Sequence, residues 1–308
     1  MSWTTRDIPS QQGRVAVVTG ANGGVGLAAA RALAAKGAHV VMAARNQSKA
    51  RSAKSDILAA DPAAAVEIVE LDLGSLASVD AAAKAILARH DQIDVLLNNA
   101  GVMAVPEGKT ADGFETQFGT NHLGHWALTA HLMPALLNAD AARVVSMTSV
   151  AHHLSRGVDA DNPHLHGSYD PWRAYNQSKL ATYHFGLGLQ QALSAAGVSA
   201  SSLIAHPGLT NSDLQSTTQA QGAGGFIGWF SEKWAKAIGM STDQGALPAL
   251  RAATDPAARG GAMYAPRFIT NGAAVRRPIL RPGNRKAIAT LWAVSERETG
   301  IELRITPR

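Results

Sequence analysis

The chain contains no cysteine and comparatively few charged residues. Without cysteine in its 308 residues, it can form neither a disulfide framework nor a thiolate nucleophile or metal ligand. Charged side chains make up only 17% of the chain, while 46% of its residues are hydrophobic, which excludes disorder and fibrous repeats. The composition instead predicts a globular protein with enough apolar residues for a full-sized core.

Long hydrophobic runs are also absent. No apolar run reaches the roughly 18 residues that a membrane-spanning helix needs, and the first residues, Met1–Gln12, are polar. We therefore predict neither a membrane span nor a signal peptide, and we expect a cytoplasmic protein.

An excess of basic residues occurs only at the end of the chain. Residues 1–258 carry 18 Lys and Arg against 20 Asp and Glu, whereas residues 259–308 carry 10 against 3. A basic tail can bind nucleic acid or a membrane surface, but Pro278 and Pro282 interrupt this one. We expect a solvated edge or a subunit contact and no nucleic-acid partner, and a homo-oligomer is among the states that the sequence allows.

Short runs rich in β-branched residues alternate with Ala-rich stretches of helical spacing. The predicted strands are Val15–Thr19, His39–Ala43, Val66–Leu71, Ile93–Leu97, Arg143–Met147 and Val198–Ala205. The predicted helices are Gly24–Lys36, Ser48–Ala60, Ser75–His90, Asn121–Leu137 and Tyr175–Ala196. Because strands that alternate with helices form right-handed βαβ units, the pattern predicts an α/β fold with a parallel sheet covered on both faces.

The absence of repeats and linkers predicts one domain over residues 1–308. Residues 13–205 form its core and residues 272–308 a basic extension. Between residues 206 and 245 the pattern breaks down, and glycines lie among aromatic residues that include Phe226, Trp229, Phe230 and Trp234. Such an insert is typical of a lid over an apolar ligand, or of a small amphipathic helix packed on the domain. The two interpretations are compatible.

A glycine-rich segment joins the first predicted strand to the first predicted helix. It reads Thr19-Gly20-Ala21-Asn22-Gly23-Gly24-Val25-Gly26. Glycine allows a tight turn in which backbone N–H groups approach a pyrophosphate, which the helix N-terminus also attracts. Because the segment follows a strand and opens a helix in the first βαβ unit, it predicts a dinucleotide site. The alternative is a mere glycine-rich turn.

No carboxylate follows the second predicted strand, where an NAD site usually holds the ribose 2′-hydroxyl with Asp or Glu. Arg45 stands there instead, with Lys49 one helical turn further along. Because a guanidinium pairs well with a 2′-phosphate, the sequence predicts NADP(H) in preference to NAD(H). The alternative is that Arg45 simply faces solvent.

Tyr175 and Lys179 are four residues apart, so a helix places them on one face. Ser149 ends the fifth predicted strand at the carboxyl edge, where open α/β sheets bind ligands. Tyrosine has a pKa near 10, and an ammonium about 4 Å away supplies roughly the 4 kcal/mol that proton transfer near neutral pH requires. We predict Tyr175 as the acid/base, lowered in pKa by Lys179, with Ser149 holding the substrate oxygen.

Seven motifs in order make the chain resemble the short-chain dehydrogenase/reductase family over about residues 13–265. They are TGANGGVG (19–26), LDL (71–73), NNAG (98–101), NHLGH (121–125), Ser149, YNQSK (175–179) and HPG (206–208). The resemblance implies an oxidoreductase with a single Rossmann-type, doubly wound parallel sheet of about seven strands.

The resemblance also implies roles for individual residues. Tyr175 is implied as the acid/base, Lys179 as a ligand of the nicotinamide ribose, and Ser149 as the group that orients the carbonyl. Asn121 is implied to hold a water in a proton relay with Lys179. The implied cofactor-binding residues outside the glycine segment are Asp72 and Leu73 at the adenine, Asn98 at the adenosine ribose, Ala100 and Gly101 of the NNAG motif, and Pro207, Gly208, Thr210 and Ser212 at the nicotinamide carboxamide.

Within the family, FGTNHLGHWALT, TSVAHH and the long gap from Ser149 to Tyr175 resemble the retinol dehydrogenase and protochlorophyllide reductase-like branch. We expect hydride transfer between NADP(H) and a carbonyl or secondary alcohol of an apolar, mid-sized substrate. The alternatives are reduction of an activated C=C bond and an NADP(H)-binding sensor without turnover. Two features depart from the branch: Thr148 stands where another Ser is common and is a minor rival to Ser149, and the long tail puts subunit pairing through the final strand in doubt.

Several other polar residues are assigned no catalytic role. No carboxylate at a short ligand spacing accompanies His152, His153, His164 and His166, so we expect no metal and place these histidines at the surface or in a substrate loop. We expect His122 and His125 to pack or form hydrogen bonds and Asp94 and Asn99 to be structural. Trp172 either lines the substrate cleft or packs.

Overall fold

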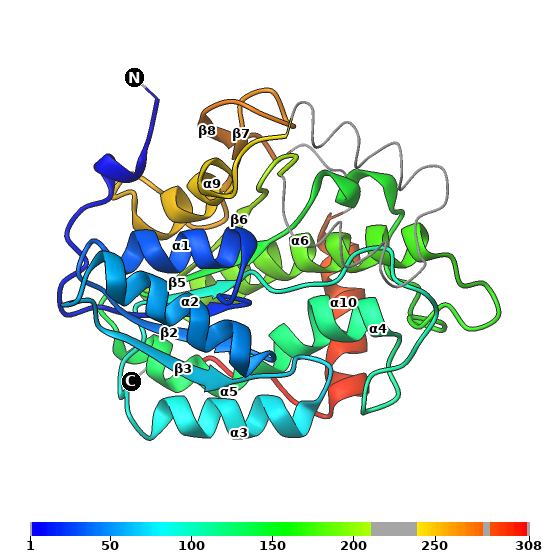
Figure 1. Cartoon of the computed structure of the whole chain (residues 1–308). Helices are drawn as coiled ribbons and strands as arrows, with labels where there is room; N and C mark the ends of the chain where they lie inside the picture. The colour runs from blue at the N-terminus through cyan, green and yellow to red at the C-terminus, as the bar shows by residue number, and fades with distance from the viewer. Residues whose placement is uncertain (1, 211–238, 280–283, 307–308) are drawn as a thin grey trace.

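An eight-stranded sheet forms the centre of the chain, for which a computed structural model describes residues 2–210, 239–279 and 284–306 (Figure 1). Its order is β3-β2-β1-β4-β5-β6-β7-β8. The strands are β1 Val15–Thr19, β2 His39–Ala44, β3 Val66–Glu70, β4 Val95–Asn98, β5 Arg143–Met147, β6 Ser201–Ala205, β7 Met263–Pro266 and β8 Ala274–Arg277. All neighbours are parallel except β7 and β8. The order reverses between β1 and β4, so ligands of such a sheet bind at the carboxyl ends of these strands.

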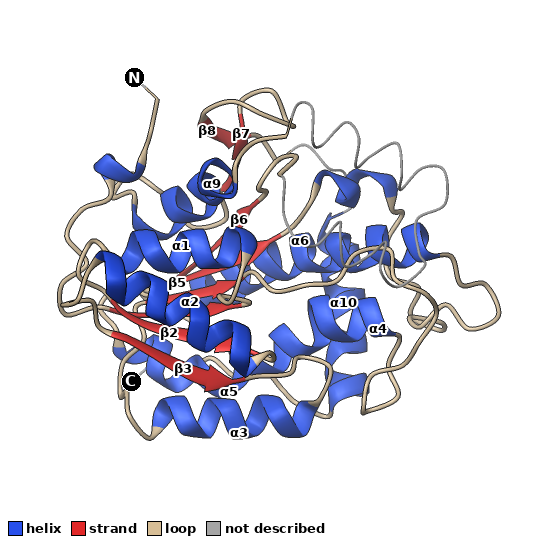
Figure 2. Ribbon diagram, viewed as in Figure 1, coloured by secondary structure: helices blue, strands red, loops and turns tan. Residues whose placement is uncertain are grey.

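Helices cover the sheet on both faces (Figure 2). One apolar cluster joins the sheet to α1 (Gly24–Ala34), α2 (Gln47–Ala60) and α9 (Thr242–Thr254). The other joins it to four helices: α3 (Leu76–Leu87), α5 (Gly124–Asn138), α6 (Pro171–Ala195) and α10 (Asn284–Thr299). The remaining short elements are α4 (Thr116–Phe118), η1 (Thr5–Asp7), η2 (Gly119–Leu123) and η3 (Val150–Leu154). Of the helices described, none has the length and apolarity that a membrane crossing requires.

The predicted α/β fold is confirmed, and the predicted strands and helices recur with small shifts at their ends. The helix that carries Tyr175 begins earlier, at Pro171, because the Asp170 side chain accepts a hydrogen bond from the Arg173 N–H at 2.7 Å and caps it. The sixth strand begins later than predicted, at Ser201. The helix predicted from Asn121 is divided into a π-helical turn, η2, and α5.

The basic extension forms two ordered elements, of which β8 is an antiparallel edge strand. The other is α10, which turns an apolar face toward α6 although Arg285 and Lys286 at its start are exposed. The Trp292 ring stacks on Phe185 at a centroid distance of 5.9 Å. It also lies so close to Gly188 that a Cβ there would come within 2.3 Å of the ring. The end of the chain is therefore part of the hydrophobic core.

Replacing Leu291 by alanine tests this role of α10. Leu291 is fully buried, and removing a buried leucine side chain costs about 2–5 kcal/mol. We expect urea unfolding of Leu291→Ala to show a loss in that range, whereas Arg285→Ala on the exposed side should change the free energy of unfolding by less than about 0.5 kcal/mol. A loss below about 1 kcal/mol for Leu291→Ala would show that α10 contributes little to the core.

Candidate active site

The turn between β1 and α1 is built by glycine. Gly20 and Gly24 have positive φ angles of 68° and 54°, in the left-handed region that glycine tolerates. Gly23 is the N-cap of α1, and no side chain caps this end of the helix, which leaves it suited to an anion. A Cβ on Gly26 would lie 2.4 Å from the Gly20 carbonyl oxygen. The turn holds all six residues predicted from the motif: Gly20, Asn22, Gly23, Gly24, Val25 and Gly26.

Thr19 ties the end of β1 to the turn after β4. Its Oγ1 accepts hydrogen bonds from the backbone N–H groups of Asn99 and Ala100, both at 2.9 Å. The Asn99 side chain donates to the Thr19 carbonyl at 2.9 Å, as expected of a structural residue. Asn98 is buried, and its Oδ1 has no hydrogen-bond partner among the described residues. Asn98 therefore keeps an acceptor for a ligand beside the glycine turn.

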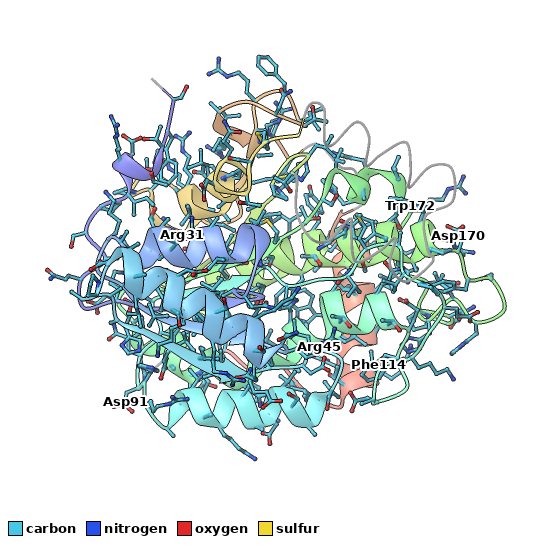
Figure 3. The ribbon with its side chains drawn as sticks, viewed as in Figure 1. Arg31, Arg45, Asp91, Phe114, Asp170 and Trp172 are labelled. Atoms are coloured by element: carbon cyan, nitrogen blue, oxygen red, sulfur yellow. The ribbon has the colours of Figure 1, made fainter. Side chains whose placement is uncertain are left out.

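Arg45 follows β2 at the carboxyl edge of the sheet (Figure 3). Its side chain is 74% exposed, and its Nη1 lies 3.8 Å from Asp72 Oδ2. The other oxygen of Asp72 accepts a hydrogen bond from the Gly74 N–H at 2.9 Å. Leu73 is buried and Lys49 is exposed on α2. An exposed pair at this distance is weak, so the guanidinium can turn to another anion at small cost.

Ser149, Tyr175 and Lys179 meet at the carboxyl end of β5. The Ser149 side chain lies close enough to the Tyr175 phenol to act on its pKa, and both Tyr175 and Lys179 are buried. Lys179 Nζ lies 5.8 Å from the centre of the Tyr175 ring and donates to the Met147 carbonyl at 3.2 Å. The predicted acid, ammonium and hydroxyl are thus together.

Thr148, the rival of Ser149, has a different partner. Its Oγ1 donates to the backbone carbonyl of Lys179 at 2.7 Å and it is buried. It therefore joins the end of β5 to α6, whereas Ser149 is the residue in contact with Tyr175.

Asn121 lies within the π-helical turn η2. Its amide is fully used: Oδ1 accepts from the Val102 N–H at 2.8 Å, and Nδ2 donates to the Val102 carbonyl at 2.9 Å and to Ser178 Oγ at 2.8 Å. The Ser178 hydroxyl in turn donates to the Tyr175 carbonyl at 2.8 Å. Gly101 lies against the same group, because a Cβ there would come within 2.9 Å of Asn121 Oδ1 and 3.3 Å of Lys179 Nζ. Asn121 therefore fixes the position of α6 against the NNAG turn.

His125 connects Asn121 to the glycine turn. Its Nδ1 lies 3.0 Å from the Asn121 carbonyl and its Nε2 lies 3.0 Å from Thr19 Oγ1. Burial lowers the pKa of His125 to about 4, so the ring is neutral at pH 7. Because a carbonyl only accepts, we assign the proton to Nδ1. His125 forms hydrogen bonds as predicted, but the sequence does not predict this link to Thr19; its signal is the helical i, i+4 spacing from Asn121.

Burial sets the pKa values of the two central groups. It raises the pKa of Tyr175 above its usual value, and the nearby Ser149 side chain works in the opposite direction. Burial lowers the pKa of Lys179 to about 8. Among the chain's own groups, the expected lowering of the phenol's pKa by Lys179 is therefore not seen.

A pocket of about 330 Å³ is lined in part by Val150, the residue that follows Ser149. Its lining comes from η3, α6, β6, β7 and the segments that follow them: Val150, His152, His153, Tyr183, His206, Met263, Ala265, Ile269, Arg277 and Pro278. The volume falls within the usual range of small-molecule sites. His206 is buried, its Nε2 has no hydrogen-bond partner among the described residues, and burial lowers its pKa to about 3. The wall of the pocket therefore combines five apolar side chains with Tyr183, Arg277 and three histidines, of which His206 is neutral.

The residues predicted at the nicotinamide end follow β6. Pro207, Gly208 and Thr210 lie in the loop that leads away from its carboxyl end, and Thr210 pairs with Met240 in an isolated bridge. Ser212 and the aromatic residues of the predicted lid lie outside the described residues.

The other polar residues have structural partners. Asp94 Oδ2 accepts a hydrogen bond from the Val15 N–H at 2.8 Å. His122 Nε2 lies 2.7 Å from Ser295 Oγ on α10, and His164 Nε2 lies 2.9 Å from Glu298 Oε2. The Trp172 ring, labelled in Figure 3, lies edge-on to the Tyr175 ring at a centroid distance of 6.1 Å, so it contacts the predicted acid rather than only packing in the core.

Comparisons with known proteins agree with this geometry. The family model of the short chain dehydrogenases matches residues 14–223. Polyprenol dehydrogenase of Mus musculus is 36% identical over 299 residues, 95% of this chain and 86% of that protein. Retinol dehydrogenase 12 of Homo sapiens is 42% identical over 202 residues, 66% of this chain and 63% of that protein. The solved structure of an uncharacterised Mycobacterium paratuberculosis protein has a TM-score of 0.79 at 38% identity and covers 99% of this chain and 100% of that one.

Because the Lys179 ammonium is buried, we predict that replacing it by an uncharged side chain raises the free energy of unfolding. Between about pH 8 and 10.5 the unfolded chain binds the Lys179 proton more tightly than the folded one, so wild-type stability rises with pH in this window. In the absence of cofactor, Lys179→Met should be more stable than wild type at pH 7, by about 1–3 kcal/mol, and this advantage should shrink by pH 9.5.

Urea unfolding at the two pH values measures this difference. Lys84→Met is the control, because Lys84 is 74% exposed and forms only a surface pair with Asp80. It should change the free energy of unfolding by less than about 0.5 kcal/mol. A Lys179→Met variant less stable than wild type at both pH values would show that the ammonium holds the site together.

Proposed function

The chain belongs to the short-chain dehydrogenase/reductase family and is an oxidoreductase that acts on alcohol or carbonyl groups; we propose that it prefers NADP(H), uses Tyr175 as its acid/base and acts on an apolar, mid-sized substrate. The observation that carries this proposal is the contact between Ser149 and Tyr175 beside the pocket. Lys179 lies one helical turn away, against the NNAG turn.

The residues of the carboxyl edge fit a dinucleotide. The uncapped N-terminus of α1 and the close turn at Gly26 suit its pyrophosphate. Buried Asn98 has a free Oδ1 for a ribose hydroxyl, and Lys179 and Gly101 lie at the nicotinamide end. When bound, the nicotinamide supplies or accepts the hydride and, in its oxidised form, adds positive charge near the phenol.

The chain's own residues then handle the substrate oxygen. In the reductive direction the Tyr175 hydroxyl donates its proton to the nascent alkoxide, and the Ser149 hydroxyl holds the same oxygen while charge develops on it. Because Lys179 does not lower the pKa of the phenol in the protein alone, the phenolate that remains would depend on the positive charge that the oxidised nicotinamide adds when bound. Asn121 is a positioning residue, because its amide is fully engaged by Val102 and Ser178.

Two observations favour an apolar substrate. Val150, Met263, Ala265, Ile269 and Pro278 give the pocket an apolar part beside its histidines and Arg277, and two relatives are named for polyprenol and retinol. We therefore propose an alcohol of retinoid or polyprenoid kind, or its carbonyl counterpart, with the hydroxyl-bearing carbon at Tyr175 and the hydrocarbon chain in the pocket.

Replacing Tyr175 by phenylalanine tests the acid. We expect Tyr175→Phe to lower the turnover of retinaldehyde or another isoprenoid aldehyde with NADPH by about 100-fold or more, with NADPH affinity changed little. Tyr169→Phe is the matched control, because among the described residues the Tyr169 hydroxyl donates to the Val105 carbonyl and accepts from Gln117, away from Ser149 and Lys179. Turnover retained by Tyr175→Phe would place the acid elsewhere.

Replacing Arg45 by alanine tests the cofactor preference. A charge-assisted contact contributes about 1.5–3 kcal/mol, so Arg45→Ala should weaken NADPH binding by about 10-fold or more and leave NADH binding unchanged. Fluorescence titration of both cofactors measures this. Arg51→Ala, at an exposed arginine on helix α2, which follows Arg45, should change neither affinity. Tighter binding of NADH than of NADPH by the wild type would contradict the role of Arg45.

A further inference from the structure

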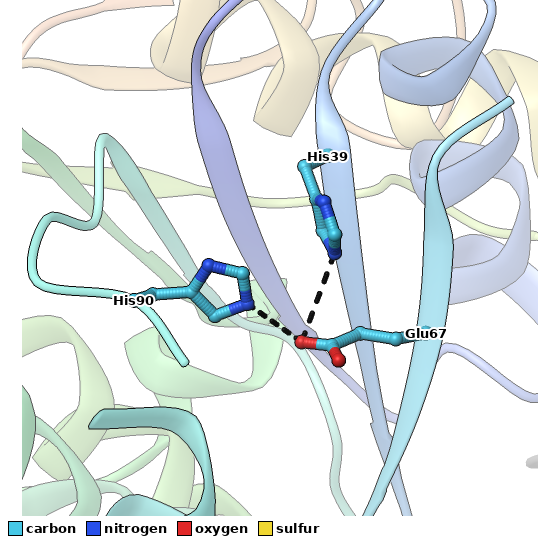
Figure 4. A group of neighbouring side chains, drawn as sticks. All are labelled: His39, Glu67 and His90. Carbon is cyan, nitrogen blue, oxygen red and sulfur yellow. Dashed lines mark hydrogen bonds and ion pairs between the residues drawn. The ribbon is translucent and has the colours of Figure 1, made fainter. Parts of the chain in front are cut away.

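Two histidines and a glutamate meet at the amino edge of the sheet, opposite the candidate active site. His39 begins β2, Glu67 lies near the start of β3, and His90 follows α3. One ligand atom of each residue lies within 4.8 Å of the other two. Figure 4 shows both imidazoles directed at the same carboxylate oxygen.

The register of the sheet explains why they meet. Glu67 is paired with Val41, so the two side chains point to the same face. His39 precedes Val41 by two residues and therefore points to that face as well. Helix α3 packs on this face through residues such as Ile86, and the turn that follows it brings His90 to Glu67.

The distances are close to those of a metal site. His90 Nε2 lies 2.7 Å and His39 Nε2 lies 3.8 Å from Glu67 Oε1. Ligand atoms about 2.0–2.1 Å from Zn²⁺ are roughly 3.3 Å apart in a tetrahedron. The observed distances lie on either side of this value, so small side-chain movements suffice.

His39 Nε2 lies near Glu67 but forms no hydrogen bond with any of the described residues. This nitrogen is shielded from solvent, although the His39 side chain as a whole is 40% exposed. A plain His90–Glu67 ion pair leaves this nitrogen unexplained.

Arg89 sets the orientation of the carboxylate. Its Nη1 lies 2.6 Å from Glu67 Oε2 and leaves Oε1 directed at the two histidines. Such outer contacts commonly orient metal ligands. Because Arg89 and nearby Lys54 also add positive charge, we expect micromolar rather than tighter binding.

We propose that His39, Glu67 and His90 form a site for a divalent transition-metal ion of the Zn²⁺ type, with a fourth position open to water. Two imidazoles and one carboxylate are ligands that such ions accept. The ion joins β2, β3 and the turn after α3, and stabilises this edge of the sheet. The sequence predicts no metal site because these three ligands lie far apart in it, and only the fold brings them together.

Zinc titration of the full chain tests the site. Wild-type protein, treated with EDTA and desalted, should bind one Zn²⁺ at this site in isothermal titration calorimetry. It should gain about 5 °C in Tm at a zinc concentration about 100 times Kd. His39→Gln and His90→Gln should each lose the gain in Tm and weaken binding by at least about 10-fold. His131→Gln, on α5 outside the cluster, is the matched control and should behave as wild type.

Two results would overturn the proposal. One is wild-type protein without saturable zinc binding, and the other is equal affinity in wild type, His39→Gln and His90→Gln, which would place the ion at other histidines. Anomalous scattering at the zinc edge from wild-type crystals gives a readout that does not depend on how the variants fold. It should show a peak between His39, Glu67 and His90, and a peak only elsewhere contradicts the site.

Discussion

An ammonium group held inside the domain is the constraint on which the site depends. Lys179 is 5% exposed, and its only described hydrogen-bond acceptor is the Met147 carbonyl at 3.2 Å. Keeping a charge there costs free energy, as its lowered pKa of about 8 shows. The rest of the fold must supply that free energy. Much of it comes from the burial of α6, which is 25 residues long and buried along most of its first five turns. The hydrogen bonds of Thr148 and Asn121 then hold this helix to β5 and to the NNAG turn.

The strands and the glycine turn could be predicted because their signals are local. Val15–Thr19 is a continuous apolar run, and glycine is the residue that the turn conformations at Gly20 and Gly24 favour. By contrast, the hydrogen bond from Asn121 to Ser178 could not be predicted, because it joins residues 57 positions apart. The π-helical turn that holds Asn121 could not be predicted either, because such a turn has no distinctive local pattern. For helix α10, the local pattern was present in the sequence but did not lead to the right prediction. Ile288, Leu291 and Ser295 follow a helical spacing and are buried, but the basic charge around them suggested a solvated tail.

The two edges of one sheet carry different chemistry. At the carboxyl edge, the reversal of strand order between β1 and β4 brings the ends of non-adjacent chain segments together beside the glycine turn, where we propose that Arg45, Asn98 and Lys179 bind one ligand. At the amino edge, the same parallel register brings His39 and Glu67 to one face. The first arrangement follows from motifs, whereas the second becomes visible only when the register is known.

The pKa of the Tyr175 phenol is the most direct test of the account. It can be followed by NMR in protein with ¹³C at the tyrosine Cζ atoms, with Tyr175→Phe to assign the signal. We expect a pKa above the usual value near 10 in the protein alone. Addition of NADP⁺ should lower it by more than about 1 unit, because the oxidised nicotinamide adds positive charge beside the phenol. A pKa that NADP⁺ leaves unchanged would contradict the role of Tyr175 as the acid.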